Sequence, residues 1–289
     1  MKKILSCALL GAVLAGHASA ESSNLNSASP IVYTKYGAVL GARTVRGVEF
    51  LGIPYAKAPV GELRWRGPQK PAPWGGVKRA ETYAPRCLQS RDLDSLARPQ
   101  GSEDCLYLNI FAPRDVKKSD KLPVLFWIHG GELVTGSGAD FDPSDLAKAS
   151  NTIVVTFNYR LGVLGFLAAD GLAREKMRHA NYGLMDQIAA LDFVRENIRA
   201  FGGNPANITI IGPERIRRSS PITMKEALAL GNAFAREMGC AASKTMDSLA
   251  SAKCLRTLPA EKIIAMQKPY VTRRLIIDDD LVPGYSNLN

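Results

Sequence analysis

Histidine is scarce in this chain, with three among 289 residues: His17, His129 and His179. A metal centre therefore has few imidazole donors, and no two cysteines have the C-x-x-C spacing of a zinc site. A hydroxyl nucleophile needs a base within hydrogen-bond reach, so the same scarcity restricts catalysis by serine.

Long apolar runs are missing after the first twenty residues, so no membrane span is expected there. The first twenty residues resemble a secretory signal peptide. Lys2-Lys3 precedes an apolar stretch, and Ala18-Ser19-Ala20 is a small-residue cleavage site. We predict that residues 1–20 are removed by cleavage after Ala20 and that residues 21–289 form the mature domain, which is secreted or periplasmic.

Motifs that read nucleic acid are also missing. The net charge of +10 falls to +8 once Lys2 and Lys3 leave with the signal peptide. Because the basic residues are scattered, a solvated basic surface is favoured over a nucleic-acid or other anionic partner.

Four cysteines remain when Cys7 leaves with the signal peptide: Cys87, Cys105, Cys240 and Cys254. An even number in an exported chain favours disulfides. Pairing Cys87 with Cys105 and Cys240 with Cys254 would close loops of about 15 residues, each stabilising the fold by ~3 kcal/mol in the chain-entropy model. Metal ligation is the less favoured alternative.

The order of the apolar runs predicts an α/β fold. Three runs are apolar on both faces, as expected for strands buried between helices: 123–128, 152–157 and 208–211. Between the last two, apolar residues recur at helical spacing from Leu184 to Ile198. The order strand, helix, strand implies a mostly parallel sheet with flanking helices.

Shorter patterns lie on either side of these runs. Before them, β-branched residues alternate with glycine and predict an antiparallel hairpin, with strands at 31–33, 38–40 and 48–51. After residue 222 the pattern is helical. Thr223 and Glu226 have the spacing of a capping box, and a further helix should begin near Pro259.

The motif with chemical content is His129-Gly130-Gly131-Glu132, which directly follows the run at 123–128. Its glycines let backbone N–H groups point at a ligand, and acyl transfer needs such donors to hold a developing oxyanion. By itself, the motif is equally typical of an ordinary glycine turn.

The surrounding motifs resemble the type-B carboxylesterase and cholinesterase family. In the family's order they read FLGIPYA (50–56), PVGELRW (59–65), SEDCLYLNI (102–110), NYRLG (158–162), NYGLMDQ (181–187), FGGNP (201–205) and NITIIG (207–212). They cover the chain almost continuously from about residue 31 to residue 212. The two cysteine pairs also resemble the family's disulfides.

This resemblance implies an α/β-hydrolase fold that cleaves small-molecule carboxylic esters without a cofactor. A serine attacks the carbonyl, a histidine carries the proton and an acid orients the histidine. In the oxyanion hole that the resemblance implies, Gly131 and Glu132 match the family's backbone donors, and Gly130 lies beside them. Position 132 is usually small in the family, so a Glu132 carboxylate that points inward would oppose catalysis, whereas one turned to solvent would be harmless.

The family pattern breaks after Gly212. The resemblance places the serine of a nucleophile elbow there, but Glu214 occupies the serine's position, with bulky Arg215 after it. We infer an internal deletion or an out-of-frame stretch near residues 213–220, and we interpret Ser219 and Ser220 as loop serines. The neighbouring arginines could bind phosphate, but this interpretation is disfavoured because no glycine-rich loop accompanies them: Arg215, Arg217 and Arg218.

The base and the acid are missing as well. His129 belongs to the oxyanion motif, and His179 is expected in a surface loop. The resemblance places the family's histidine and acid beyond Asn289, as in a C-terminally truncated domain. Three consecutive aspartates near that end are expected to be solvated loop acids: Asp278, Asp279 and Asp280.

Three hypotheses follow from these observations. A working carboxylesterase is opposed by the missing nucleophile and base, since losing a triad leaves roughly 10³–10⁴-fold catalysis over water. A secreted non-catalytic protein that binds a ligand or partner is the alternative. A degraded product would expose apolar surface and an unpaired edge at strand 208–211. On physical grounds the sequence favours the degraded product, as a carboxylesterase relative that is inactive or severely impaired.

Overall fold

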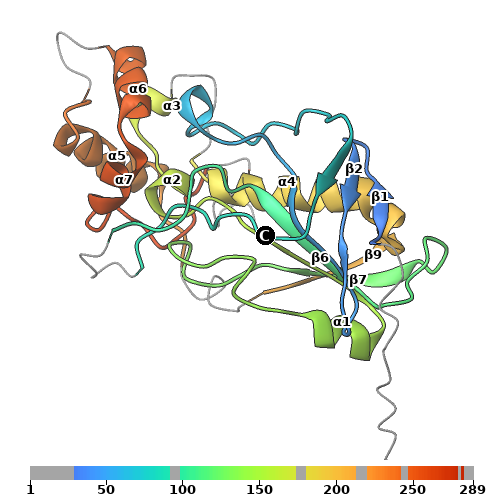
Figure 1. Ribbon diagram of the computed structural model, residues 1–289. Coiled ribbons are helices and arrows are strands. Elements are labelled where there is room, and N and C mark those ends of the chain that lie inside the picture. The colour runs from blue at the N-terminus through green and yellow to red at the C-terminus, as the bar shows by residue number, and fades with distance from the viewer. Residues whose placement is uncertain are drawn as a thin grey trace, which may run out of the picture.

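The computed structural model describes residues 29–91, 98–173, 180–212, 220–241, 247–278 and 281–282. They form an α/β fold with a central six-stranded sheet, a small N-terminal sheet and a group of helices at one end (Figure 1). The predicted signal peptide lies outside the described residues.

The small sheet contains the predicted N-terminal hairpin. Strands β1 (Ile31–Tyr33) and β2 (Ala38–Leu40) pair antiparallel, and β5 (Val77–Arg79) adds to β2 in parallel. The hairpin turn needs glycine at position 37, because a Cβ there would lie 2.4 Å from the indole nitrogen of Trp74. That indole donates a hydrogen bond of 2.9 Å to the carbonyl of Ala38, which fixes the turn against the following loop.

The central sheet is mixed. Its order is β3-β4-β6-β8-β7-β9, formed by Ala42–Arg43, Val48–Pro54, Tyr107–Ala112, Ile153–Phe157, Leu122–Trp127 and Gly203–Ile211. The predicted parallel pairing is present in β8-β7-β9, whereas β3, β4 and β6 join by antiparallel pairs. The sequence predicted no strand at β6.

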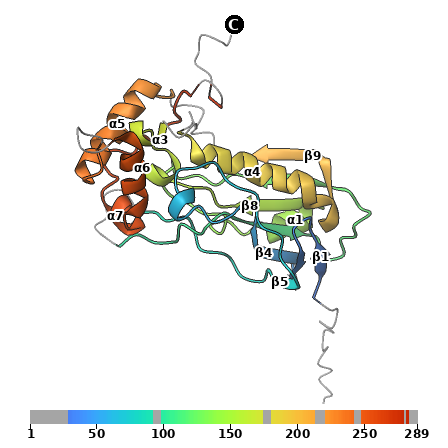
Figure 2. The same cartoon turned by 90° about the horizontal axis from the view of Figure 1, so that it is seen from above.

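Helices cover both faces of this sheet, as the α/β prediction requires. Alternate residues of β8 face opposite sides: Ile153 and Val155 pack in the core under α4 (Tyr182–Asn197), whereas Val154 packs with Ala147 of α1 (Ser144–Ser150). The short helix η2 (Ile198–Phe201) follows α4. Figures 1 and 2 show α4 running along the sheet, with α1 on the other side.

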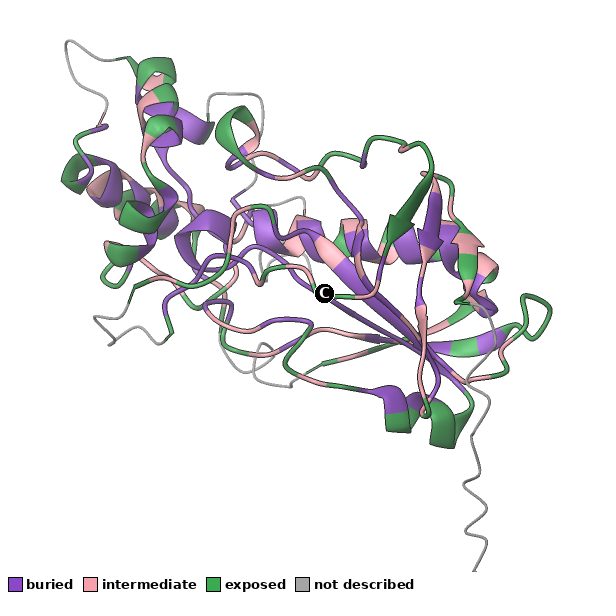
Figure 3. Ribbon diagram, in the orientation of Figure 1, coloured by how far each residue is buried: buried purple, intermediate pink, exposed green. Residues whose placement is uncertain are grey.

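A second core lies in the helical end of the molecule. It contains α2 (Gly162–Gly165), α3 (Asp170–Ala173), α5 (Met224–Glu237), α6 (Ser248–Thr257) and α7 (Ala260–Ala265). The capping box of Thr223 and Glu226 is formed at the start of α5. Pro259 precedes α7 at its N-cap. Figure 3 shows buried residues on the inner sides of these helices and exposed residues on their outer sides.

Both predicted disulfides are formed. Cys87 is joined to Cys105 in the loop before β6, and Cys240 after α5 is joined to Cys254 of α6. Arg64, just after η1 (Gly61–Leu63), connects the loop before β6 to the group of helices at the end of the molecule. It binds Glu103 through two contacts of 2.6 Å and donates to three carbonyls at the end of α6, those of Leu255, Arg256 and Leu258.

Strand β9 is an edge of the sheet in the part of the chain that the structure describes, because its pairing partner there is β7 alone. The side chain of Ile210 is 54% exposed. This agrees with the exposed apolar edge expected at residues 208–211. Of the helices in the described ranges, none has both the length and the apolar character that crossing a bilayer requires.

Candidate oxyanion site

The glycine motif lies at the carboxyl edge of two neighbouring parallel strands. Ile128, just after β7, donates a backbone hydrogen bond of 2.9 Å to Ile211 of β9. The chain therefore leaves β7 into His129 beside the point where it leaves β9 into Gly212. Ligand sites in open α/β sheets form at this edge.

The backbone of the motif has a left-handed conformation that glycine permits. Gly131 has a φ of 103°, and a Cβ there would lie 2.1 Å from the carbonyl oxygen of Thr135. That carbonyl approaches because the amides of Val134 and Thr135 both donate to the Gly131 carbonyl at 3.0 Å. A side chain at position 131 would therefore open the turn.

Contacts with two other segments hold this loop in place. The side-chain amide of Gln89 accepts from the Gly136 amide at 2.9 Å and donates to the Gly136 carbonyl at 2.9 Å. The amide of Gly162 donates to the Leu133 carbonyl at 2.7 Å. The loop is thus fixed to the disulfide-bonded loop and to α2, which is the pre-organisation an oxyanion hole needs.

Donors remain available on the motif. Within the described ranges, the backbone N–H groups of Gly130 and Gly131 donate to no protein acceptor. Gly131 is exposed and Gly130 is partly exposed. Two amides at the end of a buried strand are therefore accessible to an anionic oxygen.

His129 is a structural residue of this loop. It is 1% exposed, its Nδ1 donates to the Gly130 carbonyl at 2.8 Å, and its ring stacks on Tyr159 with centroids 4.2 Å apart. The Tyr159 hydroxyl donates to the His129 carbonyl at 3.0 Å. Burial lowers the pKa of His129 to about 4, so the ring is neutral at pH 7. The neutral, buried ring thus stabilises the conformation of the loop through its contacts with Gly130 and Tyr159.

The side chain of Glu132 is exposed and forms an ion pair of 3.0 Å with Arg273. Glu132 has a φ of 56°, another left-handed residue in the loop. Of the two orientations considered from the sequence, the structure has the outward one.

Several residues discussed from the sequence lie outside the described residues: His179, Glu214, Arg215, Arg217, Arg218, Ser219, Asp279 and Asp280. Ser220 is described and exposed. The expectation for Asp278 was wrong, because this residue is 7% exposed. Its carboxylate accepts from Asn181 at 2.8 Å and from the amides of Leu281 and Val282 at 2.9 and 3.0 Å. It organises a turn instead of being solvated.

Sequence reasoning missed several supporting residues of this site. Gln89, Tyr159 and Arg273 contact the loop from segments that lie far from it in the sequence. Of these three residues, only Tyr159 belongs to a motif that the sequence analysis had identified, the family motif NYRLG at 158–162. Nothing in the local patterns around Gln89 or Arg273 indicates their contacts.

Comparison with known proteins identifies the family to which this chain is similar. A sequence model described as "Carboxylesterase family" matches residues 28–214. Para-nitrobenzyl esterase of Bacillus subtilis (strain 168) is 43% identical over 229 residues, which are 76% of this chain and 46% of that protein. Acylcarnitine hydrolase of Mus musculus is 37% identical over 300 residues, covering 89% of this chain and 52% of that protein.

The solved structures agree with the sequence matches. A PNB esterase structure superposes with a TM-score of 0.78 at 34% identity, covering 89% of this chain and 59% of that chain. This similarity confirms the α/β-hydrolase fold. The chain spans about half the length of the curated relatives it matches.

Proposed function

This chain belongs to the carboxylesterase family, and we propose that its 289 residues keep the oxyanion-binding part of an ester-hydrolase site without the groups that attack the ester. With this amino-acid sequence, the polypeptide is inactive or severely impaired as a carboxylic ester hydrolase. The observation that carries this proposal is the pair of accessible amides at Gly130 and Gly131 beside a histidine that is buried and already engaged.

The state of His129 supports the absence of a general base. Its Nδ1 is occupied by the Gly130 carbonyl, and its Nε2 is buried without a hydrogen-bond partner among the described residues. A base must lie within hydrogen-bond reach of the proton it removes. The ring is 1% exposed, its Nδ1 is engaged and its Nε2 is buried, so neither nitrogen is available to take a proton from a hydroxyl at the surface of the loop.

The sequence after β9 supports the absence of a nucleophile. Gly212 is followed by Pro213-Glu214-Arg215, where the resemblance places a small-residue elbow around a serine. A carboxylate at position 214 cannot be activated by proton removal in the way that a serine hydroxyl is. The retained amides would then bind a carboxylate or an ester oxygen without turnover.

The site is tested with purified residues 21–289 and two assays. We expect no covalent labelling by a fluorophosphonate probe and hydrolysis of p-nitrophenyl butyrate at most ~10³–10⁴-fold above water. The B. subtilis relative is the positive control in both assays. Stoichiometric labelling that is lost in a Ser220→Ala variant would overturn the proposal.

The alternative function is a secreted non-catalytic protein that binds a small ester or carboxylate through this loop. Two cores and two disulfides favour a chain that folds over a degraded product. A single cooperative thermal transition would support this alternative, and broad unfolding without a transition would contradict it.

We also propose export from the cytoplasm after cleavage following Ala20. The two disulfides support this location, because disulfides persist in oxidising compartments. N-terminal sequencing of the protein secreted by an expression host should begin at Glu21. Retention of Met1 on a cytoplasmic product would contradict the proposal.

A further inference from the structure

We propose that Gln89 is a positioning residue of the candidate oxyanion site and that it fixes the direction in which the backbone N–H of Gly131 points, an inference that rests on the function proposed above. Gln89 acts through Gly136, which lies 47 positions later in the sequence. Its side chain holds Gly136 against the carbonyl group of Gly130.

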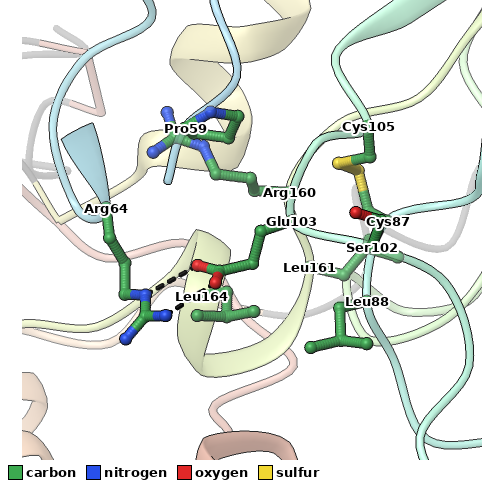
Figure 4. Close-up of a pocket in the computed structure, with 10 residues that line it drawn as sticks. All are labelled: Pro59, Arg64, Cys87, Leu88, Ser102, Glu103, Cys105, Arg160, Leu161 and Leu164. Carbon is green, nitrogen blue, oxygen red and sulfur yellow. Dashed lines mark hydrogen bonds and ion pairs between the residues drawn. A yellow bond between two sulfur atoms is a disulfide. The ribbon is translucent and has the colours of Figure 1, made fainter. Parts of the chain in front are cut away.

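Gln89 belongs to a segment that is itself firmly held. Its backbone exchanges two hydrogen bonds with Gln100, of 3.0 and 2.8 Å. Two residues earlier, the disulfide between Cys87 and Cys105 closes the same segment, and Figure 4 shows this disulfide with Ser102 beside it. The Gln89 side chain is 3% exposed, and its Nε2 donates to the Cys87 carbonyl at 2.8 Å. Both the backbone and the side chain of Gln89 are therefore fixed.

The side-chain amide of Gln89 binds both backbone groups of Gly136. Its Oε1 accepts from the Gly136 N–H at 2.9 Å, and its Nε2 donates to the Gly136 carbonyl at 2.9 Å. The opposite orientation of this amide would place its oxygen against two carbonyls, so hydrogen bonding allows one orientation only. Two bonds to one residue fix the rotation of Gly136 as well as its position.

Gly136 in turn confines the carbonyl group of Gly130. A Cβ on Gly136 would lie 2.5 Å from the Gly130 carbonyl oxygen and would also collide with Nδ1 of His129. The backbone of Gly136 is thus directly against both groups. The same carbonyl oxygen accepts from His129 Nδ1 at 2.8 Å. The imidazole and the backbone of Gly136 together hold this oxygen in one place.

The position of this carbonyl determines the direction of the next amide. The peptide bond between Gly130 and Gly131 is trans and planar, so the Gly131 N–H points opposite to the Gly130 carbonyl. The carbonyl faces the buried His129 ring, and the N–H therefore points away from it, on a residue that is exposed. An oxyanion hole works through donors that are aimed before the anion arrives. Gln89 supplies that aim through Gly136.

The test is a Gln89→Met variant of residues 21–289, studied by ¹H–¹⁵N NMR during titration with butyrate. Methionine keeps a similar volume, removes the hydrogen bonds and adds no charge to a site that binds an anion. We expect saturable shifts of the Gly130 and Gly131 amides in the unaltered chain. In the variant, the Gly131 resonance should be displaced before butyrate is added. Butyrate should also bind about tenfold more weakly, the factor that corresponds to one hydrogen bond.

Asn197→Leu is the matched control. Asn197 is also a buried amide, at 3% exposure, and it accepts from the Lys35 N–H and donates to the Phe193 carbonyl at 2.8 Å each. Neither partner belongs to the glycine loop. The control should lose a similar amount of stability in urea and bind butyrate as the unaltered chain does. Equal losses of affinity in the two variants would show that Gln89 only supports the fold, which would overturn the inference.

Two further outcomes separate this inference from the proposed function. Without saturable shifts in the unaltered chain, the proposed function fails and this inference fails with it. Unchanged affinity in a folded Gln89→Met variant would overturn this inference alone. Hydrogen exchange in the unaltered chain gives a measurement that needs no variant, because the Gly136 amide should exchange at least about tenfold more slowly than the Gly131 amide. Equal exchange rates would also overturn the inference.

Discussion

The guanidinium of Arg273 lies 3.0 Å from the carboxylate of Glu132, although the two residues are 141 positions apart in the sequence. Both residues have left-handed backbone conformations, with φ values of 49° and 56°. The ion pair therefore joins two strained turns, one in the glycine loop after β7 and one after α7.

Replacing Glu132 with glycine should leave stability unchanged or raise it by up to about 1 kcal/mol. Glycine relieves the left-handed backbone, which offsets the loss of an exposed pair contributing ~1 kcal/mol or less. Arg273→Ala removes the same pair without that relief and should lower stability slightly. Urea denaturation of both variants checks this, and a loss above about 1 kcal/mol for Glu132→Gly would contradict it.

Replacing Gly131 with alanine should destabilise the chain by about 1–3 kcal/mol. The φ of 103° is unfavourable for alanine, and its Cβ would meet the Thr135 carbonyl at 2.1 Å. The matched control is Gly75→Ala, because a Cβ at Gly75 has no heavy atom within 4 Å. Similar unfolding midpoints for the two variants would show that the loop is more adaptable than the structure indicates.

Acid should destabilise the fold through His129. Because burial lowers its folded pKa to about 4 from 6.5, the unfolded chain binds the proton more tightly. The contribution is fully present above pH 6.5 and is lost as the pH falls towards 4, with a total on the order of 3 kcal/mol. Urea unfolding between pH 4 and pH 7 measures it. His129→Gln should show a flatter pH profile, and an unchanged slope would exclude His129 as the source.

Two carboxylates on α4 should respond very differently to neutralisation. Asp186→Asn leaves the buried Arg160 guanidinium without its counter-charge, and breaking such a pair costs about 3–5 kcal/mol. Asp192→Asn, on the same helix, loses an exposed pair with Arg195 and should cost less than about 1 kcal/mol. Thermal and urea unfolding compare the two. Equal losses would mean that burial does not determine the energetics of these pairs.

Introducing charge at the sheet edge should reduce self-association. Ile210 is 54% exposed on β9, which is unpaired on one side within the described residues. Lysine on an edge strand opposes pairing with another chain. Ile210→Lys should therefore show less concentration-dependent light scattering than the unaltered chain. Leu249→Lys, also exposed but on helix α6, is the control and should change scattering less.

The parts of the fold that depend on local patterns were predicted well. β1 and β2 have the predicted bounds, and the Thr223–Glu226 capping box is formed. These features depend on residues that are neighbours in the sequence. The resemblance motifs added the prediction that His129-Gly130-Gly131-Glu132 forms an oxyanion hole, which periodicity could not supply and which stays a prediction.

The features missed by sequence reasoning depend on contacts between distant segments. β6 was not predicted as a strand because its central Asn109 interrupts the apolar run, yet this side chain is buried and bonded to Thr156 and the Gly52 amide. Asp278 was expected in solvent because three aspartates stand together. Its burial depends on Asn181, which lies 97 positions earlier.

The contacts of Arg64 have a consequence for how the molecule comes apart. One guanidinium holds Glu103 near the sheet and, through Nη1, carbonyls at the end of α6. Opening the helical end would leave this buried cation and those carbonyls without partners at the same moment. The two cores should consequently melt in a single calorimetric step, and mild proteolysis should release no helical fragment that stays folded alone.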